Sequence, residues 1–195
     1  MPQLPIILAS ASPARLELLS RIGIHPSVIP ADVDETEYRG ELPKDVAARL
    51  SIAKAEKVAL EAESGYIIGA DTVAAVGRRI MPKALTTEMV ADCLRLYSGR
   101  RHRLYTGVHI IKKTDKIESR SRVVETTVRV KVLTEEEIQF YAHSGEGLHK
   151  AGGYSIQGIF QSFVPFISGS FSNIIGLPLF ETRNMLMSLG LDSLR

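Results

Sequence analysis

Isolated polar side chains that follow or flank apolar segments are the residues best placed to do chemistry in this sequence. Asp71 comes directly after the apolar run 67–70, and its carboxylate could bind a metal ion or orient a water molecule. Ser10 follows the short apolar run 6–9. Ligands of open α/β sheets bind beyond the carboxyl ends of strands, where we expect both side chains. Asp71 has a second interpretation, as a residue that ends a strand and caps the next turn.

Three basic side chains could neutralise an anionic ligand, and each also has a purely structural interpretation. Lys54 lies one turn after Leu50 and one turn before Val58, so its ammonium could reach inward or extend to water. Arg15 lies in the first turn of a predicted helix, where a cation opposes the helix dipole and a bound anion would offset it. Lys83 is the third candidate.

Two charged runs are more typical of solvated surface than of a site. The acidic loop 32–37 could nevertheless supply Glu35 as a second oxygen ligand for a metal beside Asp71. The basic run 100–103 is interpreted as a solvated turn, because no aromatic residues interleave it as they do in many nucleic-acid sites. With 24 basic and 22 acidic side chains, no overall field favours nucleic acid or membrane. An anionic ligand must therefore be held by a local cluster.

Several familiar devices are missing from the sequence. It contains no GxxxxGK[ST] phosphate loop, GxGxxG, HExxH or GxSxG motif, and its five histidines have no ligand-like spacing. The single Cys93 excludes an internal disulfide and suits a reducing compartment, so we expect a cytoplasmic protein. Residues 1–9 lack a basic segment, and no stretch of about 18 apolar residues occurs, so neither export nor membrane spanning is expected.

Five helices are predicted from capping residues and apolar spacing. Ser12 is expected to cap the first helix, with Pro13 at its first position. Thr134 and Glu137 form a capping box for the fourth. The expected ranges are 13–23, 43–63, a third helix that Thr86 or Thr87 caps and that runs to Tyr97, 134–145 and 178–190. In the longest helix, the expected buried stripe consists of Val46, Leu50, Ala53 and Leu60.

Apolar and alternating segments predict the strands. The expected strands are 6–9, a short piece near 28, 66–70, 104–112, 122–133 and one near 160–167. In 122–133, Val128, Val130 and Val132 alternate with polar residues, which indicates an antiparallel strand with one wet face. Strand–helix units mixed with hairpins indicate an α/β protein with a mixed sheet. At 195 residues, we expect one domain over residues 1–195, with two lobes.

The order and spacing of many short motifs resemble those of the Maf family, from Ile7 to about Leu189. The matching segments are 8–15 with Leu18-Leu19, 33–35, 49–50, 53–55, 69–72, Lys83, 96–99, 105–108, 150–154, 156–158 and 175–179. The resemblance implies an elongated α/β fold similar to that of inosine triphosphate pyrophosphatases, with a cleft between two lobes, and a homodimer. It also implies an enzyme that hydrolyses a nucleoside triphosphate to a monophosphate and diphosphate with Mg²⁺ or Mn²⁺.

The resemblance also implies roles for single residues. Asp71 would be the general base or the metal-linked water activator, and Glu35 would help to hold the metal ion. The triphosphate would be neutralised by Arg15, Lys54 and Lys83, and Ser10 and Ser12 would offer donors at a helix start.

Base preference divides the family into a branch that prefers dTTP and UTP and a branch that prefers 7-methyl-GTP and related nucleotides. Thr72 and the segment 156–158 resemble the first branch, and the amide of Gln157 can both donate to and accept from a uracil or thymine edge. The first branch usually reads Ser-Pro-Arg-Arg, and this chain has Ala14 at the first Arg. One recognition contact is therefore missing. Ala84 also replaces a usual proline after Lys83.

Two other functions stay open at this point. Members of the family are also associated with septum formation and division arrest, which would suit a nucleotide-binding regulator. Such a regulator should keep its function when Asp71 is changed to Asn. A nucleic-acid binder would require a basic face, and it would show steeply salt-dependent binding.

Overall fold

The computed structural model describes residues 4–191, which form a seven-stranded sheet with flanking helices. The strands are β1 (Ile6–Leu8), β2 (Ser27–Val28), β3 (Gly65–Val76), β4 (Arg79–Ile80), β5 (Arg101–Lys113), β6 (Ile117–Arg129) and β7 (Phe166–Ser168). The helices are α1 (Pro13–Arg21), α2 (Pro43–Glu61), α3 (Thr87–Tyr97), α4 (Glu135–His143), α5 (Phe171–Ile175) and α6 (Leu179–Ser188), with a 3₁₀ helix η1 (Ile159–Phe163).

The sheet is mixed, as predicted. Its order is β2-β1-β3-β5-β6-β7, and β4 pairs with β3 outside this path. β1 runs parallel to β2 and β3, whereas β3, β5, β6 and β7 pair antiparallel. The register sets Asp71 opposite Gly107 and Leu8 opposite Ile68. The α/β class with a mixed sheet is therefore confirmed.

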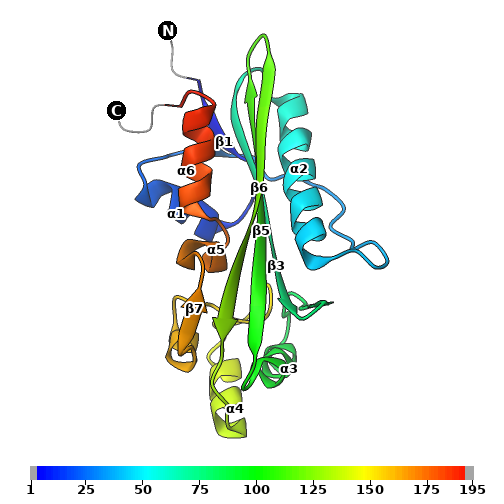
Figure 1. Ribbon diagram of the computed structural model, residues 1–195, viewed down its shortest axis with the longest axis vertical. Helices are drawn as coiled ribbons and strands as arrows, with labels where there is room; N and C mark the ends of the chain where they lie inside the picture. Colours follow the sequence, from blue (N-terminus) through cyan, green and yellow to red (C-terminus); the bar gives the residue numbers. More distant parts are fainter. Residues whose placement is uncertain (1–3, 192–195) are drawn as a thin grey trace.

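Helices cover both faces of the sheet, as Figure 1 shows, with α2 on one face and α1 and α6 on the other. Two glycines let α2 approach the strands closely. A Cβ atom at Gly69 would lie 2.2 Å from the carbonyl oxygen of Ser51, and one at Gly107 would lie 2.1 Å from that of Ala47. Side chains larger than hydrogen would separate the helix from the sheet. This contact brings Lys54 of α2 against β3.

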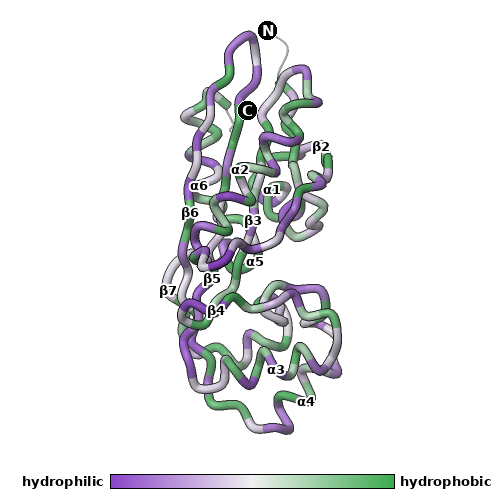
Figure 2. Tube along the Cα trace, turned by 90° about the vertical axis from the view of Figure 1, so that its right-hand side faces the viewer, coloured by the Kyte–Doolittle hydropathy of each residue, from purple (hydrophilic) through white to green (hydrophobic). Residues whose placement is uncertain are grey.

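Within residues 4–191, the two largest of four apolar clusters lie at opposite ends of the elongated molecule, and the two smaller ones pack α2 against the sheet. In Figure 2, α1, α2 and α6 surround the upper part of the long strands, and α3 and α4 lie at the lower end. The lower core is centred on the large buried rings of Tyr97, Tyr141 and Phe160. The upper core between α1, α6 and the sheet contains Leu19 and Leu186. The chain thus has two lobes, which β5 and β6 connect.

The predicted helix starts are confirmed. Ser12 caps α1 and accepts from the amide of Arg15, with Pro13 in the first turn. Thr134 and Glu137 form the predicted capping box of α4. The strands expected near residues 6–9 and 28 are also present. Among residues 4–191, no helix combines the length and hydrophobicity that crossing a membrane requires.

Three expectations about polar and apolar positions are wrong. β3 does not end at Asp71 but continues to Val76, because the residues after Asp71 also pair with β5. Lys54 neutralises the buried carboxylate of Asp71 within the strand. Leu60 is 80% exposed, since it lies two residues after buried Val58 and so on the opposite side of α2. The run 100–103 is not a turn, because β5 begins at Arg101 and buries His102.

The later part of the chain departs further from expectation. β6 begins at Ile117 and ends at Arg129, and Val132 beyond it is 76% exposed. The segment expected as one strand near 160–167 divides into η1 and the short strand β7, because its aromatic side chains pack into the lower core. The short helix α5 was not expected.

Candidate active site

A cavity of about 670 Å³ lies between the two lobes, within the range typical of ligand sites. Its walls come from the β1–α1 junction, the acidic loop, α2, β3 and the segments 80–83, 149–157 and 174–176. It contains all ten residues singled out from the sequence: Ser10, Ser12, Ala14, Arg15, Glu35, Lys54, Asp71, Thr72, Lys83 and Gln157. Side chains separated by up to 147 positions in the chain therefore share one site.

The ammonium of Lys54 lies between two carboxylates. Its Nζ is 2.6 Å from Oδ1 of Asp71 and 2.6 Å from Oε1 of Glu35. The side chains of Lys54 and Asp71 are 9% and 12% exposed, whereas that of Glu35 is 62% exposed. Lys54 therefore points inward, and it joins the helix α2 to the strand β3 and to the acidic loop.

Arg15 is held by all three nitrogens of its guanidinium. Nε donates to the carbonyl of Gly176 at 2.9 Å, Nη1 to Oγ of Ser10 at 2.9 Å and Nη2 to Oγ1 of Thr72 at 3.2 Å. Burial lowers the pKa of Arg15, and the negative charges of Asp71 and Glu35 oppose that shift. The result is a buried cation with a fixed orientation at the start of α1.

Thr72 connects Arg15 to a second polar layer. Its Oγ1 lies 2.9 Å from Oγ1 of Thr106 on β5 and donates to the carbonyl of Gly176 at 3.3 Å. Asn173 completes this layer. Its backbone carbonyl accepts from Oγ1 of Thr106, and its side-chain Nδ2 donates to the backbone carbonyl of Leu104. The position of Arg15 thus depends on β3, β5 and α5 together.

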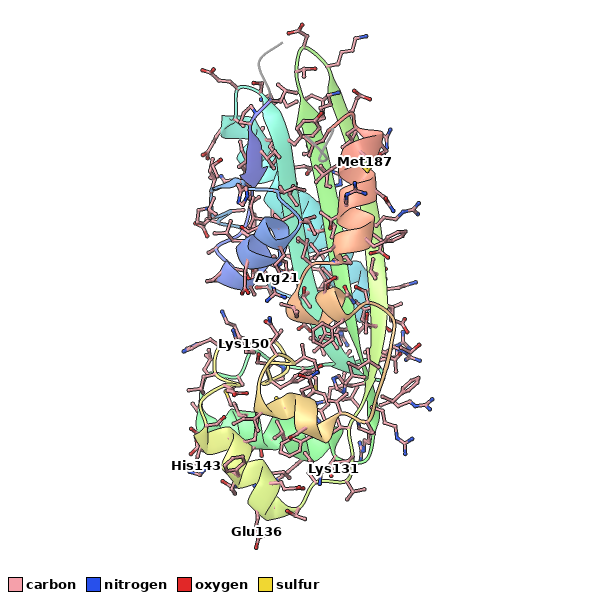
Figure 3. The ribbon with its side chains drawn as sticks, turned by 90° about the vertical axis from the view of Figure 1, so that its left-hand side faces the viewer. Arg21, Lys131, Glu136, His143, Lys150 and Met187 are labelled. Carbon is pink, nitrogen blue, oxygen red and sulfur yellow. The ribbon has the colours of Figure 1, made fainter. Side chains whose placement is uncertain are left out.

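The lower lobe supplies the opposite wall of the cavity. Lys83 and Gln157 are exposed and line it, and an isolated antiparallel bridge joins Lys83 to Ala151. Lys150 and His149 also line this wall, and Figure 3 shows Lys150 at the top of the lower lobe. Cations from both lobes therefore face the same space.

Tyr154 anchors this wall from behind. Its hydroxyl lies 2.8 Å from Nε2 of His102, whose ring is 4.1 Å from that of Tyr97. Burial lowers the pKa of His102 to about 3, so the imidazole is neutral at ordinary pH. A neutral buried network supports the segment that carries Gln157.

Some residues of the site were not singled out from the sequence. His149, Lys150 and Thr106 line the cavity or support Arg15, and Gly176 contributes only a backbone carbonyl. Lys150, a basic residue two positions before Gly152-Gly153, could have been predicted from the sequence, whereas a backbone carbonyl leaves no signal in it.

Among residues 4–191, three carboxylates line the cavity, and two of them, Glu35 and Asp71, form a pair around Lys54, whereas Glu37 lies on the same loop as Glu35. Within the described part of the chain, no cluster of three or more His, Cys, Asp or Glu side chains is arranged to hold a metal ion. Glu35 and Asp71 approach one another closely enough to share the ammonium of Lys54. Two carboxylates can hold a hard cation whose remaining ligands are water and phosphate oxygens.

The protein is an α/β protein whose cavity is lined by cations and by a pair of carboxylates. Such a site suits a polyanionic ligand, such as a chain of phosphates, together with a metal ion. The family model described as Maf-like protein matches residues 5–189, and the chain belongs to this family.

Relatives match over nearly their whole length. The chain is 54% identical over 198 residues to a protein of Orientia tsutsugamushi (strain Boryong) named nucleoside triphosphate pyrophosphatase, covering 100% of this chain and 97% of that one. It is 59% identical to a protein of the same name from Rickettsia felis, with coverage of 96% and 94%. A HAM1 protein from Coxiella burnetii has a similar structure, with a TM-score of 0.48 and 15% identity over 95% of this chain and 100% of that one.

Proposed function

We propose that this Maf-family protein is a nucleoside triphosphate pyrophosphatase, which hydrolyses a nucleoside triphosphate to a nucleoside monophosphate and diphosphate. The observation that carries the proposal is the buried ion pair of Asp71 and Lys54 in a cavity with cations on both walls. Relatives of 54% and 59% identity carry the name of this activity.

The reaction requires water to attack a phosphorus atom surrounded by negative oxygens. Asp71 takes a proton from the water, whose oxygen bonds to the α-phosphorus while the bond to the bridging oxygen breaks and diphosphate leaves. Arg15, Lys54 and Lys83 neutralise the charge that develops on the phosphate oxygens. The chain thus contributes orientation, a proton acceptor and electrostatic stabilisation.

A divalent cation, Mg²⁺ or Mn²⁺, belongs to the proposal. The carboxylates of Glu35 and Asp71 fit it, because oxygen donors suit both ions and the substrate phosphates can complete the ligand set. When bound, the ion supplies charge neutralisation and orients water and phosphate.

Pyrimidine triphosphates such as dTTP and UTP are the proposed substrates. Gln157 lines the cavity, and its amide can pair with the donor and acceptor of a uracil or thymine edge. Ala14 also lines the cavity and has no side-chain group that could donate a hydrogen bond to the nucleotide, so modified pyrimidines are proposed substrates too.

We further propose a cytoplasmic homodimer. The outer edge of β6 supports the dimer, because within residues 4–191 it pairs with β7 only at 127–129 and contacts Ser170 and Asn173 at 124–126. The exposed segment 117–123 is left as a strand edge for a second copy. Light scattering that gave a monomer mass at micromolar concentration would contradict it.

The test of the activity is release of diphosphate from dTTP, UTP, CTP, 5-methyl-UTP, GTP and 7-methyl-GTP with Mg²⁺ or Mn²⁺. Asp71→Asn should lower release by about a hundredfold or more, the scale of losing one well-placed electrostatic group. Asp115→Asn, which changes an exposed carboxylate in the β5–β6 turn, is the matched control and should leave release unchanged.

Each outcome has a distinct meaning. Release confined to dTTP and UTP supports both the reaction and the base preference. Preference for 7-methyl-GTP keeps the reaction and overturns the role of Gln157. No release from any nucleotide with either metal would contradict the enzyme and favour a nucleotide-binding regulator.

A further inference from the structure

Lys54 places its ammonium at the point where the two acidic side chains of the site converge. Both ion pairs are 2.6 Å long, one to Asp71 and one to Glu35. These are the two carboxylates that fit a divalent cation. In the free protein, Lys54 therefore pairs with the same groups that the cation would use.

Counted over the described residues, the cavity carries no net negative charge without any added ion. Its acidic side chains, Glu35, Glu37 and Asp71, are outnumbered by its basic side chains, Arg15, Lys54, Lys83 and Lys150. Lys54 forms ion pairs with both Glu35 and Asp71. A divalent cation that approached the free protein would meet no net negative charge. It would also have to separate Lys54 from its partners, and burying an unpaired ammonium is costly.

A bound triphosphate removes this cost. Its oxygens offer Lys54 new partners, and the four-carbon stem of the lysine lets the ammonium turn while α2 stays in place. Glu35 lies on a loop and is 62% exposed, so it can move away from Lys54. The two carboxylates then become free ligands beside a strongly anionic substrate.

We propose that Lys54 keeps divalent cations out of the free protein and makes the ion bind only together with the nucleotide. Lys54 is thus a positioning residue for the carboxylate pair, in addition to its contact with phosphate. The proposal rests on the proposed function for the identity of the anion, but the part that concerns the free protein does not require turnover.

The experiment measures the affinity of Mn²⁺ for the free protein, by titration calorimetry and by the electron paramagnetic resonance signal of unbound Mn²⁺. Wild type should bind Mn²⁺ weakly, and Lys54→Gln should bind it about tenfold more tightly or better, within the usual range of coupling between sites. The preformed complex of Mn²⁺ with α,β-imido-dUTP, which cannot be hydrolysed at the α–β linkage, should bind to wild type at far lower concentration than Mn²⁺ alone.

Three variants locate the effect. Lys57→Gln removes an exposed charge from the same helix and should bind Mn²⁺ as wild type does. Lys54→Arg keeps the charge and should also bind weakly. Adding Asp71→Asn to Lys54→Gln should abolish the gained affinity, and thermal unfolding by circular dichroism establishes that each variant is folded.

Free wild-type protein that binds Mn²⁺ as tightly as it binds the Mn²⁺–nucleotide complex would overturn the proposal, and this comparison requires no variant. An equal gain of affinity in Lys57→Gln would overturn it too, because the effect would then be one of general charge. Failure of wild type to hydrolyse any nucleotide would count against the proposed function, whereas the Mn²⁺ affinity of free wild type and Lys54→Gln would still decide the role of Lys54.

Discussion

The guanidinium of Arg15 donates to the carbonyl oxygen of Gly176 at 2.9 Å, across 161 positions of the chain. Two further contacts tie the same side chain to Ser10 and Thr72. These hydrogen bonds therefore connect the start of α1 to β3 and to Gly176, the residue that follows α5. Arg15 acts both as a cation of the site and as a link between its walls.

Arg15→Lys should lower both activity and stability, because a lysine keeps the charge but cannot reach three acceptors in one plane. We expect kcat/KM for the preferred nucleotide to fall on the order of a hundredfold. The free energy of unfolding should fall by about 2 kcal/mol, as expected when buried hydrogen bonds are lost. Diphosphate release and urea denaturation measure the two effects.

Arg21→Lys is the control on the same helix. Arg21 pairs with Glu17 at 2.6 Å, with both side chains about half exposed, and such a surface pair contributes at most about 1 kcal/mol. Equal losses in the two variants would mean that Arg15 has no special role.

Gly107→Ala should destabilise the protein, because the new methyl group would lie 2.1 Å from the carbonyl of Ala47 in the backbone of α2. A helix backbone cannot yield as a flexible side chain does, so we expect a loss of about 3 kcal/mol or more. The shift of α2 would also move Lys54 away from Asp71 and lower activity. Gly40→Ala is the control for backbone strain alone, since its Cβ meets open space but its φ of +81° is unfavourable for alanine. It should lose only about 1 to 2 kcal/mol. A Gly107→Ala variant as stable as Gly40→Ala would contradict the expected clash.

Local signals explain why much of the fold could be predicted. The caps of α1 and α4 depend on Ser12, Thr134 and Glu137, whose side chains bond to amides three residues away. Such contacts depend only on residues within one helical turn, so the local sequence predicts them. The order of the apolar segments predicted the mixed sheet, but it did not predict the residues at which the strands end.

The errors came from contacts that the local sequence does not contain. Asp71 looked like the end of a strand, and only its ion pair with Lys54 on another element lets it lie within β3. His102 looked solvated among arginines, yet its ring packs against Tyr97 and Tyr154. Asp71, Lys54 and Arg15 were predicted because their types suit phosphate and metal chemistry, whereas Ala14, Thr72 and Gln157 were predicted from the resemblance to the Maf family. The carbonyl of Gly176 has no side chain to indicate it.

Gln157→Leu tests the base preference. The substitution nearly conserves volume but removes the donor and acceptor, so a buried base edge would lose its partners. We expect the KM for UTP to rise at least about tenfold while kcat changes little, because the amide is remote from the phosphates. Gln161→Leu, at an exposed position of η1, is the control. Unchanged selectivity between UTP and GTP would remove Gln157 from base recognition.

His102 should make stability depend on acid. Burial lowers the pKa of His102 to about 3 in the folded protein, against about 6.5 for an unperturbed histidine. Between these values the unfolded chain binds the extra proton, so the contribution is complete above about pH 6.5 and is lost as the pH falls towards 3. The corresponding slope is at most about 1.4 kcal/mol per pH unit.

His102→Gln removes the titrating group and can place an amide nitrogen near the hydroxyl of Tyr154. The free energy of unfolding should therefore fall more steeply for wild type than for the variant as the pH is lowered from about 6.5 to about 4. This window lies between the unperturbed pKa of about 6.5 and the folded pKa of about 3. Urea denaturation at several pH values measures both slopes. Burial also lowers the pKa of His109, so a residual slope in the variant is expected and only the difference reports on His102. His143→Gln, at an exposed position, is the control. If its slope differed from that of wild type as much as the slope of His102→Gln does, burial of His102 would not be the cause.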